Sequence, residues 1–401
     1  MSSICLYFQV HQPYRIRQYS FFNIGIESNY FDEELNITIL NKVADKCYIP
    51  ANKLMLELIQ KSNKKFRIAF SISGVAIEQF EKYRPDVLDS FIRLAKTGCV
   101  EFLSETYYHS LSYVYSKPEF ERQIELHREK IVEHFNQVPK VFRNTECIFD
   151  NQLAEDIYQL GFKGILAEGV PYLLQDRSPN QLYTNAIHSK IKVLLRNFIL
   201  SDDIAFRFSN SSWSEYPLTA NKYTQWLNVQ RHSADCINLF MDYETIGEHQ
   251  SKASGIFDFI EHFAKQICSK KGFQFHTPSE ICEKYDIEGI YDANYTTSWA
   301  DTERDLSAWI QNTMQQESLN KLYSFREDIL SLKSKELLNQ WSMLQSSDHF
   351  YYMSTKHWAD GAVHQYFSPY SSPYDAYIYF INALSDLEIR IAREKANKGI
   401  H

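Results

Sequence analysis

Acidic and histidine side chains follow apolar stretches at widely separated places in this chain. The run from Cys236 to Met241 has the length of a buried strand, and it stops at Asp242. Further acids and imidazoles follow other short apolar runs in the same manner, namely His11, Glu105, His109 and Glu146. Because the carboxyl ends of parallel strands share one rim of a barrel, side chains this far apart in sequence would converge there.

Two carboxylates, two imidazoles and nearby aromatic residues suit the cleavage of a glycosidic bond. One carboxylate would attack or stabilise the anomeric carbon, and the other, with a raised pKa, would protonate the leaving oxygen. Asp242 suits the second part, because burial beside Glu244 and Glu248 would raise its pKa. Glu146 suits the first part, since the charge of the preceding Arg143 would keep it ionised.

Each of these residues also has an ordinary structural explanation. His11 could hydrogen-bond the turn that follows it, Asp242 could cap a helix, and Glu146 could favour the positive end of a helix dipole. His109 could belong to the core, and Glu105 could pair with a lysine. Any one of these explanations is plausible alone, but all of them together on one rim are less so.

A metal-dependent hydrolase, such as a carbohydrate deacetylase, is the sharpest chemical alternative. Such a site usually needs two histidines at close helical spacing plus an aspartate. None of the 13 histidines stands four residues from another, and the first strand ends in His11-Gln12-Pro13. A glycine-rich phosphate loop and a Gly-x-Ser-x-Gly elbow are also absent from the sequence. The sequence therefore predicts chemistry without a metal or another cofactor.

The composition is that of an ordinary globular protein. The 401 residues are 44% hydrophobic and 23% charged, with a formal charge of −8 and no run of lysine or arginine, so a nucleic-acid partner is not expected. The seven cysteines are scattered and odd in number, which favours reduced thiols in a cytoplasmic protein. No signal peptide and no apolar run of membrane-spanning length are present, so no membrane partner is expected either.

Strand and helix patterns alternate over about the first 280 residues. This alternation predicts a parallel α/β barrel with seven or eight strands. The expected strands are 4–10, 66–72, 100–103, 141–142, 164–167, 191–195, 236–241 and 273–275. The expected helices are 48–61, 77–97 with a break at Pro85, 118–135, 151–160, 223–229 and 255–269.

Long helical patterns replace this alternation toward the carboxyl terminus. No proline stands between Pro278 and Pro369, and leucine and tryptophan recur at helical spacing, which predicts a helical bundle. The sequence therefore indicates a barrel domain over 1–290 and a helical domain over 291–401. A polar and aromatic patch at 346–352 interrupts the bundle, and its Asp348 could either cap a helix or reach over the barrel mouth.

Five motifs in order carry a resemblance to glycoside hydrolase family 57, and above all to its α-amylase-like members. They are His-Gln-Pro-Tyr at 11–14, Glu-Phe-Leu-Ser-Glu-Thr-Tyr-Tyr-His at 101–109, Phe-Arg-Asn-Thr-Glu at 142–146, Met-Asp-Tyr-Glu-Thr-Ile-Gly-Glu-His at 241–249 and Thr-Pro-Ser-Glu at 277–280. The resemblance implies an incomplete parallel (β/α)7 barrel followed by a C-terminal helical bundle. It also implies a retaining double displacement on α-1,4-glucans without a catalytic metal.

The resemblance also assigns roles to individual residues. The family's nucleophile falls on Glu146 and its acid/base on Asp242. The positions expected to bind an α-glucan or malto-oligosaccharide are His11, Gln12, Glu105, His109, Glu244, His249 and Asp348. Two departures stand out, because Gln9 replaces a histidine of many members and His249 replaces a tryptophan of the transferases.

An α-amylase-like hydrolase is the function that this resemblance favours. Two alternatives stay open, a 4-α-glucanotransferase with the same site and a non-catalytic glucan-binding homologue whose site is disabled. The sequence does not indicate the oligomeric state.

Overall fold

Seven parallel strands build the barrel in the computed structural model, which describes residues 1–187, 189–356 and 368–399. These strands are β1 (Ser2–Val10), β2 (Ile68–Ile72), β3 (Val100–Phe102), β4 (Val141–Arg143), β5 (Gly164–Glu168), β7 (Lys192–Arg196) and β8 (Cys236–Asp242). Parallel ladders join β8, β1, β2 and β3 in one sheet and β4, β5 and β7 in the other. The edge strands β3 and β8 of the first sheet meet the edge strands β4 and β7 of the second.

Short joints, rather than ladders, close the two sheets into one barrel. Between β3 and β4, the Ser104 amide donates to the Val141 carbonyl at 3.1 Å and the Arg143 amide to the Ser104 carbonyl at 2.9 Å. Between β7 and β8, the Asn197 amide donates to the Asn238 carbonyl at 3.0 Å. The barrel is therefore a seven-stranded and incomplete one, as the family resemblance implies.

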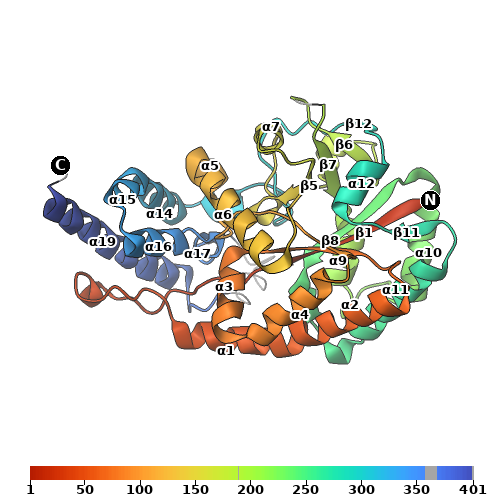
Figure 1. Cartoon of the computed structure of the whole chain (residues 1–401), viewed down its shortest axis with the longest axis horizontal. Coiled ribbons are helices and arrows are strands. Elements are labelled where there is room, and N and C mark those ends of the chain that lie inside the picture. Colours follow the sequence, from red (N-terminus) through yellow and green to blue (C-terminus); the bar gives the residue numbers. More distant parts are fainter. Residues whose placement is uncertain (188, 357–367, 400–401) are drawn as a thin grey trace.

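Helices cover the outside of the barrel (Figure 1). They are α1 (Glu33–Val43), α2 (Ile49–Lys61), α3 (Gly74–Tyr83), α4 (Pro85–Ala95), α6 (Lys117–Phe135), α7 (Asn151–Gln159), α9 (Phe198–Ala205), α10 (Ala220–Gln230), α11 (Ile256–Ser269) and α12 (Pro278–Lys284). The predicted break at Pro85 is present, because proline suits a helix start but not a helix interior. A π-helical segment, η2 (Ala44–Tyr48), joins α1 to α2.

Several elements differ from the sequence prediction. Among the described strands, the predicted last strand, β11 (Phe273–Phe275), pairs with the start of β1 alone and is not an eighth strand of the barrel. The helices α1 and α9 were not predicted, and neither was the short strand β6 (Leu182–Thr184), which is antiparallel to β7. Smaller unpredicted elements are β9 (Ile246–Gly247), β10 (Gln250–Ser251), β12 (Gly289–Ile290), α5 (Ser112–Tyr115) and α8 (Pro171–Leu174).

The carboxyl-terminal part is helical, and Figure 1 shows it beside the barrel, at the left. Its helices are α13 (Ser307–Ile310), α14 (Thr313–Ser324), α15 (Arg326–Leu332), α16 (Lys335–Met343), α17 (Ser347–Tyr351) and α19 (Pro373–Lys398). Their apolar core contains Trp309 and Trp341, and it also takes in Tyr19 and Tyr30 from the amino-terminal part. No helix in the described ranges is both long enough and apolar enough to cross a membrane.

Candidate active site

The carboxyl-terminal rim of the barrel gathers the residues singled out from the sequence. Glu146 follows β4 in the short helix η3 (Thr145–Cys147), and Asp242 is the last residue of β8. His11 follows β1, and His109 lies in the loop after β3. Asp348 comes from the helical part, in α17, and it reaches the same place.

Glu146 is held at two oxygens by two donors. Its Oε1 lies 3.1 Å from His109 Nε2, and its Oε2 accepts the indole N–H of Trp299 at 2.7 Å. Its backbone has a φ of 55°, in the left-handed region that few residues other than glycine adopt. Burial alone would raise the pKa of Glu146, but His109, Arg143 and Trp299 lower it below the ordinary value. The carboxylate is therefore kept ionised.

His109 stands between two carboxylates. Its Nδ1 lies 3.0 Å from Glu105 Oε2, while its Nε2 faces Glu146. Burial would lower the pKa of His109, but the two carboxylates outweigh it and raise that pKa to about 9. Because both acceptors are anionic, both ring nitrogens donate and the ring is an imidazolium at neutral pH.

Glu105 stabilises this imidazolium by accepting the hydrogen bond of its Nδ1–H group. The Gln9 side chain donates to Glu105 Oε1 at 3.0 Å, so Gln9 serves the site although it replaces a histidine of other members. Burial works against ionisation of Glu105, but the hydrogen bond and charge of His109 lower its pKa to about 2. The lysine partner considered for Glu105 from the sequence is wrong.

His11 joins the barrel to the helical part. Its ring stacks on that of His109 with centroids 4.2 Å apart, and its Nε2 lies 2.9 Å from Asp348 Oδ2. Burial and the charge of His109 lower the pKa of His11, so its Nε2–H donates to Asp348 while the Ser73 hydroxyl donates to Nδ1 at 2.7 Å.

Asp348 lies on the barrel rim, as one of the two interpretations of its patch predicts. Burial would raise its pKa, but the contact with His11, the charge of His109 and the Ser346 hydroxyl lower it well below the usual range. The Ser347 amide also donates to the His109 carbonyl at 2.9 Å, which fixes α17 against the barrel.

The pKa of Asp242 is shifted in the opposite direction from that of Glu146. Burial and the negative charge of Glu146 raise the pKa of Asp242 to about 6, against the lowering effect of Arg143, His109 and Arg196. Among the hydrogen bonds of the described residues, none involves its carboxyl group. Two neighbouring carboxyls whose environments push their pKa values apart are suited to the separate roles of acid and nucleophile.

Near Asp242, the side chains of Glu244 and Gln12 form a hydrogen-bonded group with Tyr48. Both bond Tyr48, whose hydroxyl donates to Glu244 Oε1, while the Gln12 side chain lies 3.2 Å from the Tyr48 oxygen and 3.5 Å from Glu244 Oε1. Burial and the charge of Asp242 raise the pKa of Glu244 to about 8.

Glu248 and His249 stand farther along the same loop. Glu248 forms ion pairs with Lys42 at 2.5 Å and Lys46 at 3.5 Å. Burial is the main cause that lowers the pKa of His249 to about 4. The charge of Glu248 acts to raise that pKa, and the charge of Lys42 acts to lower it. Burial raises the pKa of Asp242 as expected, but the like charge that raises it is chiefly that of Glu146 rather than the expected Glu244 and Glu248.

Trp299 is a site residue that sequence reasoning missed. The guanidinium groups of Arg143 and Arg196 both lie over its indole ring, 4.5 Å and 5.7 Å from the ring centroid. The Trp299 backbone amide donates to the Glu146 carbonyl at 3.1 Å, and the Arg304 guanidinium donates to the Trp299 carbonyl. Trp299 lies in an irregular segment between β12 and α13, where no periodic pattern pointed to it.

Metal-ligand geometry occurs elsewhere on the molecule. In the described ranges, one group has the spacing for a metal ion, formed by Glu81, Glu133 and His134 on the outside of α3 and α6. The Lys130 ammonium lies 2.8 Å from Glu81 in that group and neutralises it. At the rim, by contrast, His11 and His109 use both of their ring nitrogens in hydrogen bonds.

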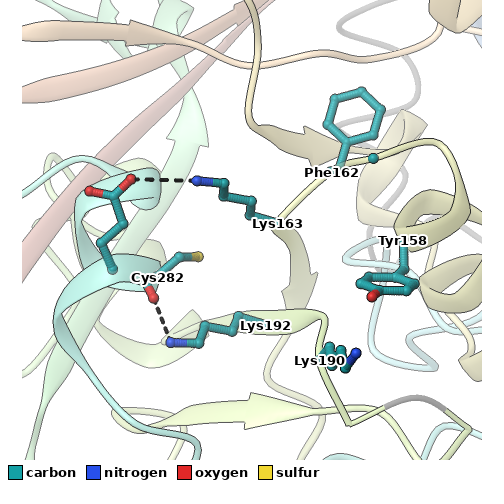
Figure 2. A pocket seen from close by; sticks show the side chains of 8 residues that line it. Tyr158, Phe162, Lys163, Lys190, Lys192 and Cys282 are labelled. Atoms are coloured by element: carbon teal, nitrogen blue, oxygen red, sulfur yellow. Dashed lines mark hydrogen bonds and ion pairs between the residues drawn. The ribbon is translucent and has the colours of Figure 1, made fainter.

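A depression of about 540 Å³ opens at the other end of the barrel, where β5 and β7 begin (Figure 2). Its lining includes Tyr158, Phe162, Lys163, Lys190, Lys192 and Cys282. The Lys192 ammonium donates to the carbonyls of Cys282 and Tyr285, and Lys163 pairs with Glu283 at 3.9 Å. These lysines therefore serve the structure, and the depression is not the candidate active site.

Two carboxyl groups with opposite pKa shifts on the rim of a parallel barrel form an arrangement that glycoside hydrolases use. The model of glycosyl hydrolase family 57 matches residues 5–294. A protein of Methanocaldococcus jannaschii named "Putative alpha-amylase" is 43% identical over 400 residues, which cover 96% of this chain and 84% of that protein. The chain therefore belongs to glycosyl hydrolase family 57.

Solved structures share the fold at low sequence identity. A family 57 branching enzyme from Thermococcus kodakaraensis has a TM-score of 0.70 and 13% identity over 98% of this chain and 91% of its own. The 4-alpha-glucanotransferase from Thermococcus litoralis has a TM-score of 0.65 and 15% identity over 87% of this chain. This chain spans only 56% of that transferase. The likeness confirms the predicted barrel followed by a helical region.

Proposed function

We propose that this glycoside hydrolase cleaves α-1,4-glucans with retention, using Glu146 as nucleophile and Asp242 as acid/base. The opposite pKa shifts of these two carboxyls, both on the barrel rim, are the observation that carries the proposal. Glu146 is held ionised by His109 and Trp299, while the pKa of Asp242 is raised to about 6. The similarity to an amylase-named protein and to the fold of a 4-alpha-glucanotransferase supports an α-glucan substrate.

The reaction would proceed in two steps. In the first, a Glu146 oxygen forms a bond to the anomeric carbon as the bond to the glycosidic oxygen breaks, and that oxygen takes the proton of Asp242. In the second, the Asp242 carboxylate removes a proton from the acceptor hydroxyl. The acceptor oxygen then bonds the anomeric carbon and releases Glu146, which restores the original configuration.

The remaining rim residues would position the nucleophile and the sugar. The imidazolium of His109, held by Glu105, orients Glu146 and compensates its charge. His11 and Asp348 offer a donor and an acceptor at the mouth, where they would exchange their mutual bond for bonds to sugar hydroxyls. On the Asp242 side, the further sugar contacts would be Gln12, Glu244 and His249. The Tyr48 hydroxyl already holds the side chains of Gln12 and Glu244 in place.

The acceptor decides between hydrolase and transferase. Water as acceptor gives an amylase, whereas a sugar hydroxyl gives a 4-α-glucanotransferase. Incubation with maltoheptaose, followed by separation of the products, tests the proposal directly. Only shorter sugars would establish a hydrolase, and longer sugars as well would establish a transferase. No conversion, with the Glu146→Ala variant as blank, would favour a non-catalytic glucan-binding protein.

We also infer a cytoplasmic location and a domain boundary near residue 290. The location is supported by the cysteines, which are all free, six of them buried. The boundary is supported by the change from strand-rich to helical structure between β12 and α13. The segment that contains Tyr19 and Tyr30 belongs to the core of the helical part, so the two domains would share side chains.

A further inference from the structure

Two exposed tyrosines stack on one another near the candidate site. Tyr172 lies in α8, and Tyr295 lies in the irregular segment that also carries Trp299. Their ring centroids are 5.8 Å apart with an angle of 26° between the planes. The two residues are 48% and 47% exposed, so both present a large part of their surface to solvent. The barrel core buries most of its aromatic rings, and this pair is not part of that core.

The pair stands on the same rim as the nucleophile. The helix α8 follows β5, which is paired with β4, the strand that leads to Glu146. Tyr295 precedes Trp299 by four residues, and Trp299 donates to Glu146. Four extended residues span at most about 14 Å, so the pair lies within reach of a sugar chain that passes from the candidate site across the rim.

The two supports of the pair are tied to each other. The Tyr291 hydroxyl donates to the Glu168 carbonyl at 2.8 Å and accepts the Val170 amide at 3.2 Å. The Thr296 hydroxyl, next to Tyr295, donates to Asp150 at 2.8 Å. Tyr291 thus ties the segment to the end of β5 and to the residue before α8, and Thr296 ties it to the start of α7. Binding would therefore not require the rings to be brought together first.

We propose that Tyr172 and Tyr295 form a binding platform for the distal sugar rings of a long α-glucan, outside the catalytic centre. The C–H faces of glucose are apolar and its hydroxyl edges are polar, which matches the apolar face and polar tip of an exposed tyrosine. This inference rests on the proposed function, because it takes the glucan as substrate. It adds that the enzyme prefers chains long enough to reach the platform, since remote contacts contribute to turnover.

The test compares short and long substrates in a double variant. In Tyr172→Ala/Tyr295→Ala, kcat/KM on amylose should fall about fivefold or more, while kcat/KM on maltotriose should stay within about twofold. The double Tyr→Phe variant keeps both ring faces and should retain most of the preference for amylose. Phe22→Ala is the matched control, because Phe22 is 83% exposed in a segment bound to α19 through Gly25 and Asp386.

A binding measurement separates the platform from catalysis. Retardation of the protein in a gel containing soluble starch should be clear in the Glu146→Gln background and should be lost when both tyrosines are replaced by alanine. Equal losses on amylose and maltotriose, or unchanged retardation, would overturn the platform and leave the proposed function intact. If the parent protein neither cleaved nor bound any α-glucan, the proposed function and the platform would fall together.

Discussion

The positive charge of His109 couples the ionisation of three side chains, His109 itself, Glu105 and Glu146. The imidazolium donates to Glu105 and Glu146, which accounts for the raised pKa of His109 and the lowered pKa values of the two acids. The ring of His11 stacks on this cation, and burial together with the charge of His109 lowers the pKa of His11. The nucleophile therefore depends on residues that need not touch the sugar, and their substitution should appear in pH profiles.

The stability of the protein should depend on the proton of His109. A histidine whose pKa is raised from 6.5 to about 9 contributes stability that is complete below pH 6.5 and is lost as pH rises through about 9. The Glu105→Gln variant removes one anionic acceptor, so the pKa of His109 should fall and this loss between pH 6.5 and 9 should shrink. Urea unfolding at pH 6, 7.5 and 9 measures it.

The control for this experiment is Glu57→Gln, which changes an exposed ion pair with Lys61 on the outside of α2. It should leave the pH dependence of the unfolding free energy as it is in the parent protein. A Glu105→Gln variant that lost the same stability over this pH range as the parent would contradict the charged state of His109.

Trp299 should tune the nucleophile through its N–H group. The Trp299→Phe variant keeps an aromatic face for Arg143 and Arg196 but removes the donor to Glu146. The pKa of Glu146 should rise, which moves the acid limb of the kcat/KM profile to higher pH, and kcat/KM at the optimum should fall about tenfold. Trp226→Phe, on α10, serves as control. A lower rate with an unmoved acid limb would reduce Trp299 to a packing role.

The two carboxylates should respond differently to removal. Glu146→Ala should abolish the glycosyl-enzyme on every substrate, whereas Asp242→Ala should still form it from a fluoride or dinitrophenyl glycoside, whose leaving group needs no proton. Azide should then release the sugar from the Asp242 variant with retention. In the parent protein, kcat/KM should decline as pH rises through about 6, because Asp242 loses its proton there.

The azide products also tell which assignment is correct. A retained glycosyl azide from the Glu146 variant and an inverted one from the Asp242 variant would reverse the two roles. If neither substitution changed turnover, both residues would be structural acids and the enzyme mechanism proposed for this site would be wrong.

At the scale of the elements, the strand ends were the predictable part of the site. Strands such as β1 and β8 are buried on nearly every residue, so their apolar runs and the polar residues that end them stand out in the sequence. Trp299 is different, since its place is set by contacts with Arg143, Arg196 and Glu146 rather than by a local pattern.

The left-handed backbone turns at the rim could not be predicted from the sequence either. His109, Glu146 and Cys147 all have φ values near 50°, a region that residue types such as glycine or asparagine would have indicated. Only the surrounding packing and hydrogen bonds hold them there. The helix α9 was missed for another reason, because its eight residues are too short to show a clear helical period.

The small helix α17 should act in binding rather than in stability. It presents Asp348 to His11 while its main chain is fixed to the His109 carbonyl. Asp348→Ala should therefore raise KM or lower kcat about tenfold, with only a small change in melting temperature, and Asp348→Asn should lose less than the alanine variant. Kinetics on maltoheptaose and a thermal scan measure both.

Asp328→Ala is the control for α17, because Asp328 is a partly exposed acid of the same helical part and pairs with Lys395. An Asp348 variant that kept full activity but melted well below this control would mean that Asp348 is a helix cap without a part in binding.

At the scale of the whole molecule, the candidate site is complete only when barrel and helical part are together. Glu146 and Asp242 come from the barrel, Trp299 from the segment that follows it, and Asp348 from the helices. In return, Tyr30 of the amino-terminal part lies in the core of the helices. The helical part therefore contributes a residue to the candidate site, and the barrel part contributes a residue to the core of the helices.

Catalysis should not depend on a metal ion, since the rim histidines are occupied by carboxylates and Ser73. Dialysis against EDTA should leave the rate on maltoheptaose within about twofold of the untreated protein, and added zinc should not raise it. Loss of activity in EDTA that zinc restores would assign the site to the metal-dependent hydrolases instead.

The two parts should unfold together. Asp386 of α19, which is buried, accepts the Gly25 amide and the Tyr30 hydroxyl, both at 2.6 Å, and so fastens the amino-terminal segment to the helices. Asp386→Ala leaves two donors without an acceptor and should lower the free energy of unfolding by about 2–4 kcal/mol. Because the parts share a core, activity and tryptophan fluorescence should still be lost in one transition, at a lower urea concentration than in the parent protein. Two separate transitions, with activity lost in only one of them, would show instead that the barrel and the helical part are independent domains.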